Sequence, residues 1–380
     1  MHKQWLDFAI KKIETAADRI KDNIPYQSYE GKYRFMNKTE DQEPLWSMGY
    51  ELLNTENVGW WTNGFWGGIL WLLYDKTGKE CYKKYAEGLE ARFDAVLEEF
   101  VNINHDAGFM WMHTSGANYR RTGNEASKLR LLKSASHLAG RFNPANNFIR
   151  AQNSPERVGR TIIDCMMNLP LLYTASQLTD DPRFANVAIA HANTMYRDTL
   201  REDGSCYHII NYNPVTGERI DAMAGQGYSA DSAWGRGMGW AIYGFALSGM
   251  YTGDMRYTEA AERCAKFFMN HLPEDGVPRA DLLAPLDDPD CVMDSSAASI
   301  AAAGMVYLAK QTGKNEYKED AMKLLQSLQN TCVAGMEEEA LLLHGNVGYH
   351  RPLSKDIPLI YGDFFYFEAL CMLDGSETLF

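Results

Sequence analysis

Thr252-Gly-Asp-Met-Arg-Tyr257 is one of four strong copies of the pattern that decides the fold. The other copies are Thr77-Gly-Lys-Glu-Cys-Tyr82, Thr179-Asp-Asp-Pro-Arg-Phe184 and Thr312-Gly-Lys-Asn-Glu-Tyr317, with Thr122-Gly-Asn-Glu-Ala-Ser127 as a weaker fifth. An apolar stretch precedes each strong copy and an amphipathic stretch follows it. Because a glycine can end one helix in the left-handed conformation and a short polar segment can begin the next, each copy predicts a helical hairpin.

The spacing of these copies predicts a closed ring of hairpins. Their starts lie 45, 57, 73 and 60 residues apart, which is typical of a repeat built from helix pairs with insertions. The first helix of each pair is the more apolar, as an inner ring requires, and the second carries the charges of an outer ring. We therefore expect an all-α fold, an (α/α)6 barrel of about six helical hairpins. An open solenoid is the alternative, although its repeats are normally more uniform and its ends capped by polar repeats.

The remaining segments predict where function resides. No linker rich in Pro, Gly or Ser divides the chain, so residues 1–380 are expected to form a single domain. Long non-helical inserts are predicted at 24–60, 102–121, 202–236, 275–296 and 334–361. In a barrel of hairpins such inserts gather at one mouth, where loops carry function on a rigid scaffold.

Composition excludes several classes of function. Lys and Arg number 37 against 50 Asp and Glu, a net charge of −13 without any basic run, so we expect no nucleic-acid partner. No run of about 18 apolar residues predicts a membrane span. The start of the chain lacks a secretory signal, and the seven scattered cysteines form no CxxC pair, which together favour a cytoplasmic protein. HExxH and EF-hand motifs are absent, so we expect no bound metal, and we also expect no cofactor. The oligomeric state is left open.

Asp164 is the most informative carboxylate. It lies among apolar residues in a segment running from Arg160 to Pro170, and it shares one helix face with Asn168, in a helix that Pro170 is expected to kink. Loss of water raises the pKa of such a carboxyl toward a value useful for a general acid. The alternative is a buried Asp164 paired with Arg160.

Asp106 is the second candidate carboxylate. It follows His105 in what reads as a polar loop, and the alternative is a simple helix cap or turn residue. One carboxylate in a polar loop and one in an apolar helix are typical of a site in which one carboxyl acts as the acid/base and the other steers the reaction.

Aromatic rings next to glycines and polar groups favour a sugar-binding site. Trp61-Thr-Asn63-Gly and Trp234-Gly-Arg236-Gly offer rings for stacking and groups for hydrogen bonding. Core packing is the alternative for any single Trp. Arg236 is predicted to bind a carboxylate at two points, and an internal ion pair, for instance with Asp231, is the alternative.

The chain resembles the unsaturated glucuronyl hydrolase family over about residues 5–370. The matching segments include WTNGFWGGILWLLY (61–74), HDAGF (105–109), GRTIIDCMMNLPLL (159–172), GQGYSADSAWGRGMGWAIYGFAL (225–247), DSSA (294–297) and YGDFFYFEAL (361–370). The resemblance implies a six-hairpin α/α barrel and a metal-free reaction. In it, 4,5-unsaturated uronic acid is removed from the non-reducing end of lyase-generated oligosaccharides of the glycosaminoglycan type.

The same resemblance implies residue roles. Asp164 looks like the general acid/base, Asp106 its partner, and His208 the histidine near the double bond. Asp164 is then expected to protonate C4 and activate water for attack at C5, which is hydration of a vinyl ether. The residues that match positions lining the substrate subsite are Trp61, His105, Gln226, Arg236 and Trp240.

Departures from the family pattern bear on specificity. Asn63 and Gln152 stand where some members have Asp and an aglycone-stacking Trp. The Ser-x-x-Ser-x-Lys pattern of members that favour sulfated fragments is absent from 348–358, where His350, Arg351 and Lys355 are the remaining candidates to hold a sulfate. Two alternatives stay open: an unsaturated rhamnogalacturonyl hydrolase acting on pectin fragments, and a non-catalytic helical scaffold.

Overall fold

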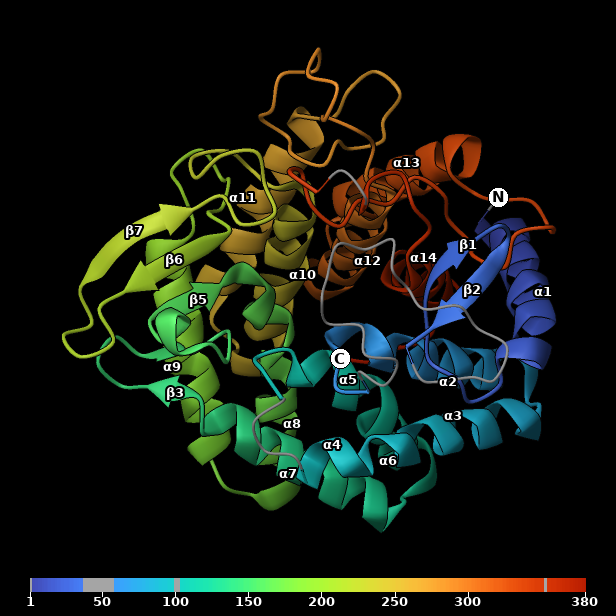
Figure 1. Ribbon diagram of the computed structural model, residues 1–380, viewed down its shortest axis with the longest axis horizontal. Coiled ribbons are helices and arrows are strands. Elements are labelled where there is room, and N and C mark those ends of the chain that lie inside the picture. Colours follow the sequence, from blue (N-terminus) through green and yellow to red (C-terminus); the bar gives the residue numbers. More distant parts are fainter. Residues whose placement is uncertain (1, 37–57, 99–102, 352–353) are drawn as a thin grey trace.

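The computed structural model describes residues 2–36, 58–98, 103–351 and 354–380, and their helices form two concentric rings (Figure 1). The outer helices are α1 (His2–Ile20), α3 (Glu80–Arg92), α7 (Glu125–Ala139), α9 (Arg183–Asp198), α11 (Met255–Asn270) and α13 (Asn315–Thr331). The inner ones are α2 (Phe65–Thr77), α5 (Ala107–Trp111) continued by η3 (Met112–Gly116) and α6 (Ala117–Thr122), α8 (Leu169–Thr179), α10 (Gly235–Thr252), α12 (Ser295–Thr312) and α14 (Ile360–Leu373). This is the predicted all-α barrel.

The repeated turns join inner to outer helices as predicted. Gly253, with φ of 71°, ends α10 in the left-handed conformation, and its N–H donates to the carbonyl of Gly249. Asp180, with φ of 51°, takes the place of glycine after α8. The threonine that opens each copy adds a feature that the pattern did not explain: its hydroxyl donates to the carbonyl four residues earlier, as Thr252 does to Ser248.

A sixth hairpin closes the ring without any such turn. Helix α14 packs against α1, which comes from the other end of the sequence, and it also contacts α12 and α2 on either side. Because the last inner helix therefore meets the first, the barrel is closed and the open solenoid is wrong.

Aromatic rings fill the barrel axis. The ring centroids of Phe109 and Trp240 lie 5.0 Å apart, those of Trp240 and Phe365 5.3 Å, and those of Phe365 and Phe380 6.1 Å. All four side chains are buried, and Figure 1 shows the C-terminus near the centre of the ring. The axis is thus a packed core and not a channel.

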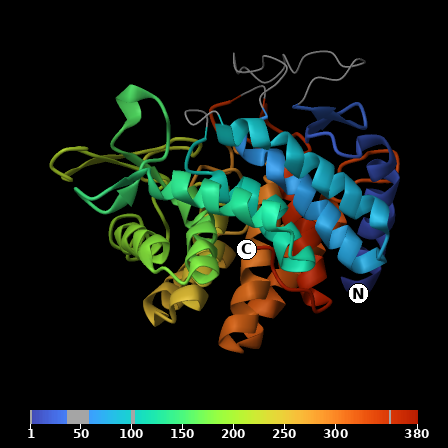
Figure 2. The same ribbon diagram turned by 90° about the horizontal axis from the view of Figure 1, so that it is seen from below.

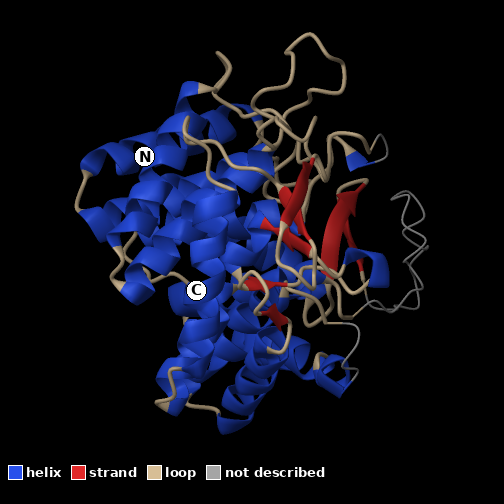
Figure 3. Ribbon diagram, turned by 90° about the vertical axis from the view of Figure 1, so that its left-hand side faces the viewer, coloured by secondary structure: helices blue, strands red, loops and turns tan. Residues whose placement is uncertain are grey.

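The short strands and the long loops lie at one end of the barrel, as Figures 2 and 3 show. The hairpins β1–β2 and β3–β4 and the antiparallel sheet β5–β6–β7 stand there, with Thr161 opposite Ile210 and Ile210 opposite Ala222. The strands are β1 (Pro25–Tyr29), β2 (Lys32–Phe35), β3 (Phe142–Asn143), β4 (Phe148–Ile149), β5 (Arg160–Ile162), β6 (Ile209–Tyr212) and β7 (Arg219–Met223). The short helices are α4 (Asp94–Glu98), η2 (Trp61–Gly64), η4 (Pro155–Arg157) and η5 (Ile163–Met167).

The prediction of a non-helical insert at 102–121 is wrong. Most of 102–121 is an inner helix, interrupted by the π-helical turn η3, and only residues 103–106 of its described part remain a loop. The Gly, His and Asn residues of 107–121 read as a loop, but they are buried inside the barrel, where packing overrides local propensity. Residues 37–57, 102 and 352–353 of the predicted inserts lie outside the described residues. None of the described helices combines the length and apolar character needed to cross a membrane.

Candidate active site

Asp164 stands where a strand turns into the barrel mouth. Strand β5 ends at Ile162 and the short helix η5 begins at Ile163. The prediction that Pro170 kinks a helix is wrong. Pro170 lies in the first turn of α8, where its missing N–H costs no hydrogen bond. Arg160 donates to Asn211 and Gln152 at 3.2 Å each, so the alternative of a buried Asp164–Arg160 pair is wrong.

Burial dominates the electrostatics of Asp164. Its side chain is 16% exposed, and desolvation raises its pKa to about 7 although the charge of Arg236 acts in the opposite direction. Its Oδ2 has no hydrogen-bond partner among the described residues. The carboxyl is thus able to keep a proton near neutral pH and to give it to a bound molecule.

Asp106 comes immediately before α5 and is as secluded as Asp164. Its side chain makes no capping bond to the helix, so the capping role is excluded. Its Oδ2 lies 3.4 Å from Nε2 of His105. Desolvation, and next the charge of Asp164, raise the pKa of Asp106 well above its ordinary value. Asp106 does lie in a loop, residues 103–106, as predicted, but the barrel mouth covers its carboxyl (8% exposed).

Asn168 joins the two carboxylate segments. Its Nδ2 donates to Oδ1 of Asp106 at 3.4 Å and to the backbone carbonyl of Asp164 at 3.1 Å. Its Oδ1 accepts from the backbone N–H of Phe109 at 2.8 Å. The sequence placed Asn168 on the same face as Asp164 but did not predict this bridge, which holds both acids at one site.

The bridge requires glycine at position 108. A Cβ atom there would lie 2.6 Å from Cα and 2.8 Å from Oδ1 of Asn168, so Gly108→Ala pushes α5 and the adjacent Asp106 away. We expect about 1–3 kcal/mol of lost stability, as for overpacking elsewhere, and a larger fractional loss of activity. Thermal melts and turnover measure the two effects. Gly362→Ala is the matched control, since its Cβ would meet Ser296 at an ordinary 3.5 Å; equal effects from both variants would contradict the argument.

His208, the residue before strand β6, faces Asp164. Its Nε2 lies 3.8 Å from Oδ2 of Asp164, and burial lowers its pKa to about 3, so the ring is neutral. The backbone N–H of Gln226 donates to its Nδ1 at 3.1 Å. Gly225, at φ of 59°, allows that turn, since a Cβ there would lie 2.3 Å from Nδ1.

Arg236 is held inside the protein. Its guanidinium donates to the carbonyls of Asn346 and Val347, and Nη1 lies 3.5 Å from Oδ2 of Asp294. The internal ion pair considered in the sequence is therefore present, with Asp294 as the partner instead of Asp231. Two-point binding of a substrate carboxylate by Arg236 stays a prediction.

The aromatic residues differ in what they offer. Trp234 and Trp240 are buried, Trp234 between His208 (ring centroids 4.1 Å apart) and the guanidinium of Arg236 (4.5 Å). Trp61 is half-buried and lies 5.1 Å from Tyr361, so it presents ring surface at the mouth.

Two residues that are predicted to contact the substrate, Asn63 and Gln226, also have hydrogen-bond partners within the protein. Nδ2 of Asn63 donates to the carbonyl of Val58 at 2.7 Å, and Gln226 donates to the carbonyl of Val347. Val347 thus receives both Gln226 and Arg236, which ties these two predicted site residues together. Substrate contacts of Asn63 and Gln226 stay predictions.

Within the part of the chain that the structure describes, no cluster of three His, Cys, Asp or Glu side chains is arranged to hold a metal ion. The expectation of a metal-free, cofactor-free reaction stays a prediction.

Comparison with known proteins assigns the family. A family model described as Glycosyl Hydrolase Family 88 matches residues 16–370. This chain belongs to Glycosyl Hydrolase Family 88. It is 35% identical over 331 residues to an unsaturated glucuronyl hydrolase of Bacillus sp. (strain GL1), covering 84% of this chain and 87% of the relative. It is 31% identical over 378 residues to an unsaturated chondroitin disaccharide hydrolase of Streptococcus pyogenes serotype M1, covering 97% and 90%.

Solved structures of family 88 support the same assignment. The crystal structure of the Bacillus sp. GL1 unsaturated glucuronyl hydrolase, described as responsible for the degradation of glycosaminoglycan, aligns with a TM-score of 0.88 at 32% identity and covers 99% of this chain and 97% of its own. These matches confirm the predicted family and barrel. A family 88 chain is a glycoside hydrolase, so the non-catalytic scaffold is set aside.

Proposed function

We propose that this enzyme releases 4,5-unsaturated uronic acid from the non-reducing end of glycosaminoglycan fragments that lyases produce. The observation that carries the proposal is the pair of buried carboxyls, Asp106 and Asp164, joined through Asn168. The names of the family 88 relatives, which include glucuronyl and chondroitin disaccharide hydrolases, support this substrate class.

Burial opposes ionisation of both carboxyls, so we infer that the pair holds one proton near neutral pH. Two interacting acids titrate as a unit, and repulsion opposes ionisation of both. Asp106 accepts a hydrogen bond from Asn168 and lies beside His105, whereas Oδ2 of Asp164 has no donor among the described residues. Because donors favour the ionised form, we assign the reacting proton to Asp164 and the ionised form to Asp106, although burial and the charge of Asp164 also raise the pKa of Asp106 well above its ordinary value.

That proton starts the reaction. Asp164 gives it to C4, a C4–H bond forms as the C4=C5 double bond is lost, and the carboxylate of Asp106 stabilises the positive charge at C5. Asp164, now ionised, takes a proton from the water that attacks C5. The resulting hemiketal opens and releases the rest of the saccharide as an alcohol. Since the glycosidic bond is not attacked directly, the separation of the carboxyls does not predict retention or inversion.

The aromatic and polar groups around the pair position the sugar. Trp61 offers a stacking surface, and neutral His208 stands beside Asp164 on the side of the double bond. Asn63, Gln226, Trp234, Arg236 and Trp240 complete the proposed subsite. We further propose that residues 1–380 act as one catalytic domain, without a cofactor, in the cytoplasm. Unpaired states of all seven cysteines support that compartment.

A substrate panel tests the proposed function. Unsaturated disaccharides from chondroitin, hyaluronan and heparin and unsaturated products of a pectin lyase are compared by the loss of the ultraviolet absorbance of the C4=C5 bond. We expect higher kcat/KM on the glycosaminoglycan products. A higher value on the pectin fragments would instead make the enzyme an unsaturated rhamnogalacturonyl hydrolase.

A further inference from the structure

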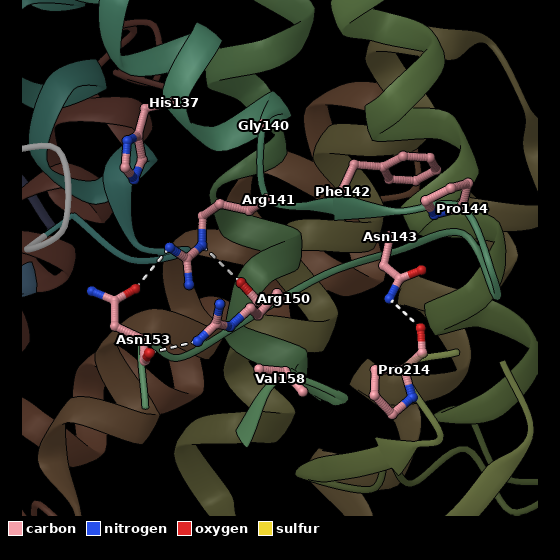
Figure 4. Close-up of a pocket in the computed structure, with 10 residues that line it drawn as sticks. All are labelled: His137, Gly140, Arg141, Phe142, Asn143, Pro144, Arg150, Asn153, Val158 and Pro214. Atoms are coloured by element: carbon pink, nitrogen blue, oxygen red, sulfur yellow. Dashed lines mark hydrogen bonds between the residues drawn. The ribbon is translucent and has the colours of Figure 1, made fainter. Parts of the chain in front are cut away.

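A pocket with a volume of about 490 Å³ lies between the end of α7 and the β3–β4 hairpin (Figure 4). Arg141 and Arg150 form one side together with Asn153, and Phe142 and Val158 contribute apolar surface. None of the residues of the proposed catalytic and substrate-binding site lines it. Its mixture of cationic, polar and apolar groups is typical of a ligand site.

The two guanidinium groups of this pocket are not neutralised. Arg141 donates to the carbonyls of Ile103, Arg150 and Ala151 and to Oδ1 of Asn153. Arg150 donates to the carbonyls of Asn153 and Ser154, and its Nε has no partner among the described residues. No carboxylate of the described chain pairs with either group. Burial, and next the charge of Arg150, lower the pKa of Arg141 to about 10, so two like charges face a common space.

The backbone of Ala151 joins the wall of the pocket to the loop that carries Asp106. The carbonyl of Ala151 accepts from Arg141 at 3.2 Å and also from the backbone N–H of His105 at 3.2 Å. The charge of Arg141 acts directly on Asp106. From Ala151 the chain passes through Gln152 to Asn153, so a saccharide that extends outward from the catalytic pair along this segment reaches Arg150.

Gln152 is held by two further arginines of the same segment. Its Oε1 accepts hydrogen bonds from Arg157 and Arg160 at 3.2 Å each. The segment 141–160 thus contains four arginines, of which Arg141 and Arg150 line the pocket, in a protein whose net charge is −13. By contrast, Lys355 pairs with Asp290 at 2.5 Å and His350 contacts the carbonyl of Tyr228 at 2.9 Å, so these two sulfate candidates of the sequence have internal partners.

We propose that the Arg141–Arg150 pocket binds an anionic group, a sulfate or a carboxylate, on the saccharide that leaves. The inference rests on the proposed function and deepens it by naming the class of aglycone. Arg150 supplies the contact, because its guanidinium keeps donors available and matches the planar or tetrahedral oxygens of such anions. Arg141, whose donors are largely occupied, supplies charge and holds the wall in place.

The test compares three substrates that share the unsaturated uronic acid but carry a sulfated, a carboxylated or an uncharged aglycone. For Arg150→Gln we expect KM to rise by about 10-fold or more on an anionic aglycone, as for the loss of a hydrogen bond to a charged group. KM on the uncharged aglycone and all kcat values stay within about two-fold, because the catalytic pair is untouched. Arg150→Lys keeps the charge and recovers part of the loss.

Arg183→Gln is the matched control, since Arg183 is 67% exposed on α9 and its loss changes the net charge equally. A rise in KM for only the sulfated or only the carboxylated substrate identifies which anion binds. Equal changes on all three substrates, or no change on any, would overturn the inference while leaving the proposed function intact. Failure of the wild-type enzyme to consume any of the three would overturn the proposed function itself.

Discussion

Asp164→Asn lowers kcat by about 10²–10⁴-fold or more, the usual cost of losing a general acid, and leaves substrate binding largely intact. Asparagine preserves the shape of the side chain but has no proton to give to C4. Turnover of the unsaturated disaccharides measures the effect, and the KM of any residual activity reports on binding. Asp231→Asn, a substitution at an exposed site, is the control and keeps wild-type turnover.

The same variant is expected to be more stable than the wild type at alkaline pH. The pKa of Asp164 is about 7 in the folded protein against an ordinary 3.8, so between these values the folded state binds a proton that the unfolded state releases. Stability of the wild type therefore falls as pH rises through this window, and Asp164→Asn does not share that loss. Thermal midpoints on both sides of the window measure it. A kcat within a few-fold of wild type, or a variant that fails to fold, would contradict the assigned role.

Asp106→Asn has the second largest expected effect, a loss of about 10²-fold in kcat. It also changes the pH profile. Wild-type activity declines above the pKa of Asp164, about 7, as the acid form disappears. The charge of Asp164 raises the pKa of Asp106, and such repulsion is mutual. Removal of the charge of Asp106 therefore lowers the pKa of Asp164 and moves the alkaline limb of kcat/KM to lower pH.

The pH dependence of kcat/KM for both proteins checks this sign. Asn168 and His105 remain in the variant, so the comparison isolates the charge of Asp106. An alkaline limb that stays in place, or moves to higher pH, would show that the two carboxyls do not share a proton.

The parts of the fold that depend on short stretches of sequence were predictable. Four Thr-Gly turns and one Thr-Asp turn mark five hairpins, because a left-handed residue and a following polar segment are features of the chain itself. The pairing of α14 with α1 has no such signal, since it joins segments more than 330 residues apart. The helix Ala107–Thr122 was hidden because its polar residues are buried only by the barrel around them.

In the candidate site, likewise, some features were predictable from the sequence and others were not. Its acids, Asp106 and Asp164, were predictable from their neighbours in the sequence, and so was a role for Arg236. The partners were not: Asp294, 58 positions along the chain, pairs with Arg236, and Asn168 bridges to an acid 62 positions away. The burial of Asp106 likewise arises from segments brought together only in the folded barrel. Local context predicts the chemistry of a side chain, and tertiary packing sets its surroundings.

The proposed mechanism depends on a protonated Asp164, which infrared difference spectroscopy of wild type against Asp164→Asn detects. Below neutral pH, we expect the C=O stretch of a protonated carboxyl in the wild type. This band is missing in the variant and disappears with an apparent pKa of about 7. A difference spectrum that contains only carboxylate bands across this range would contradict that mechanism.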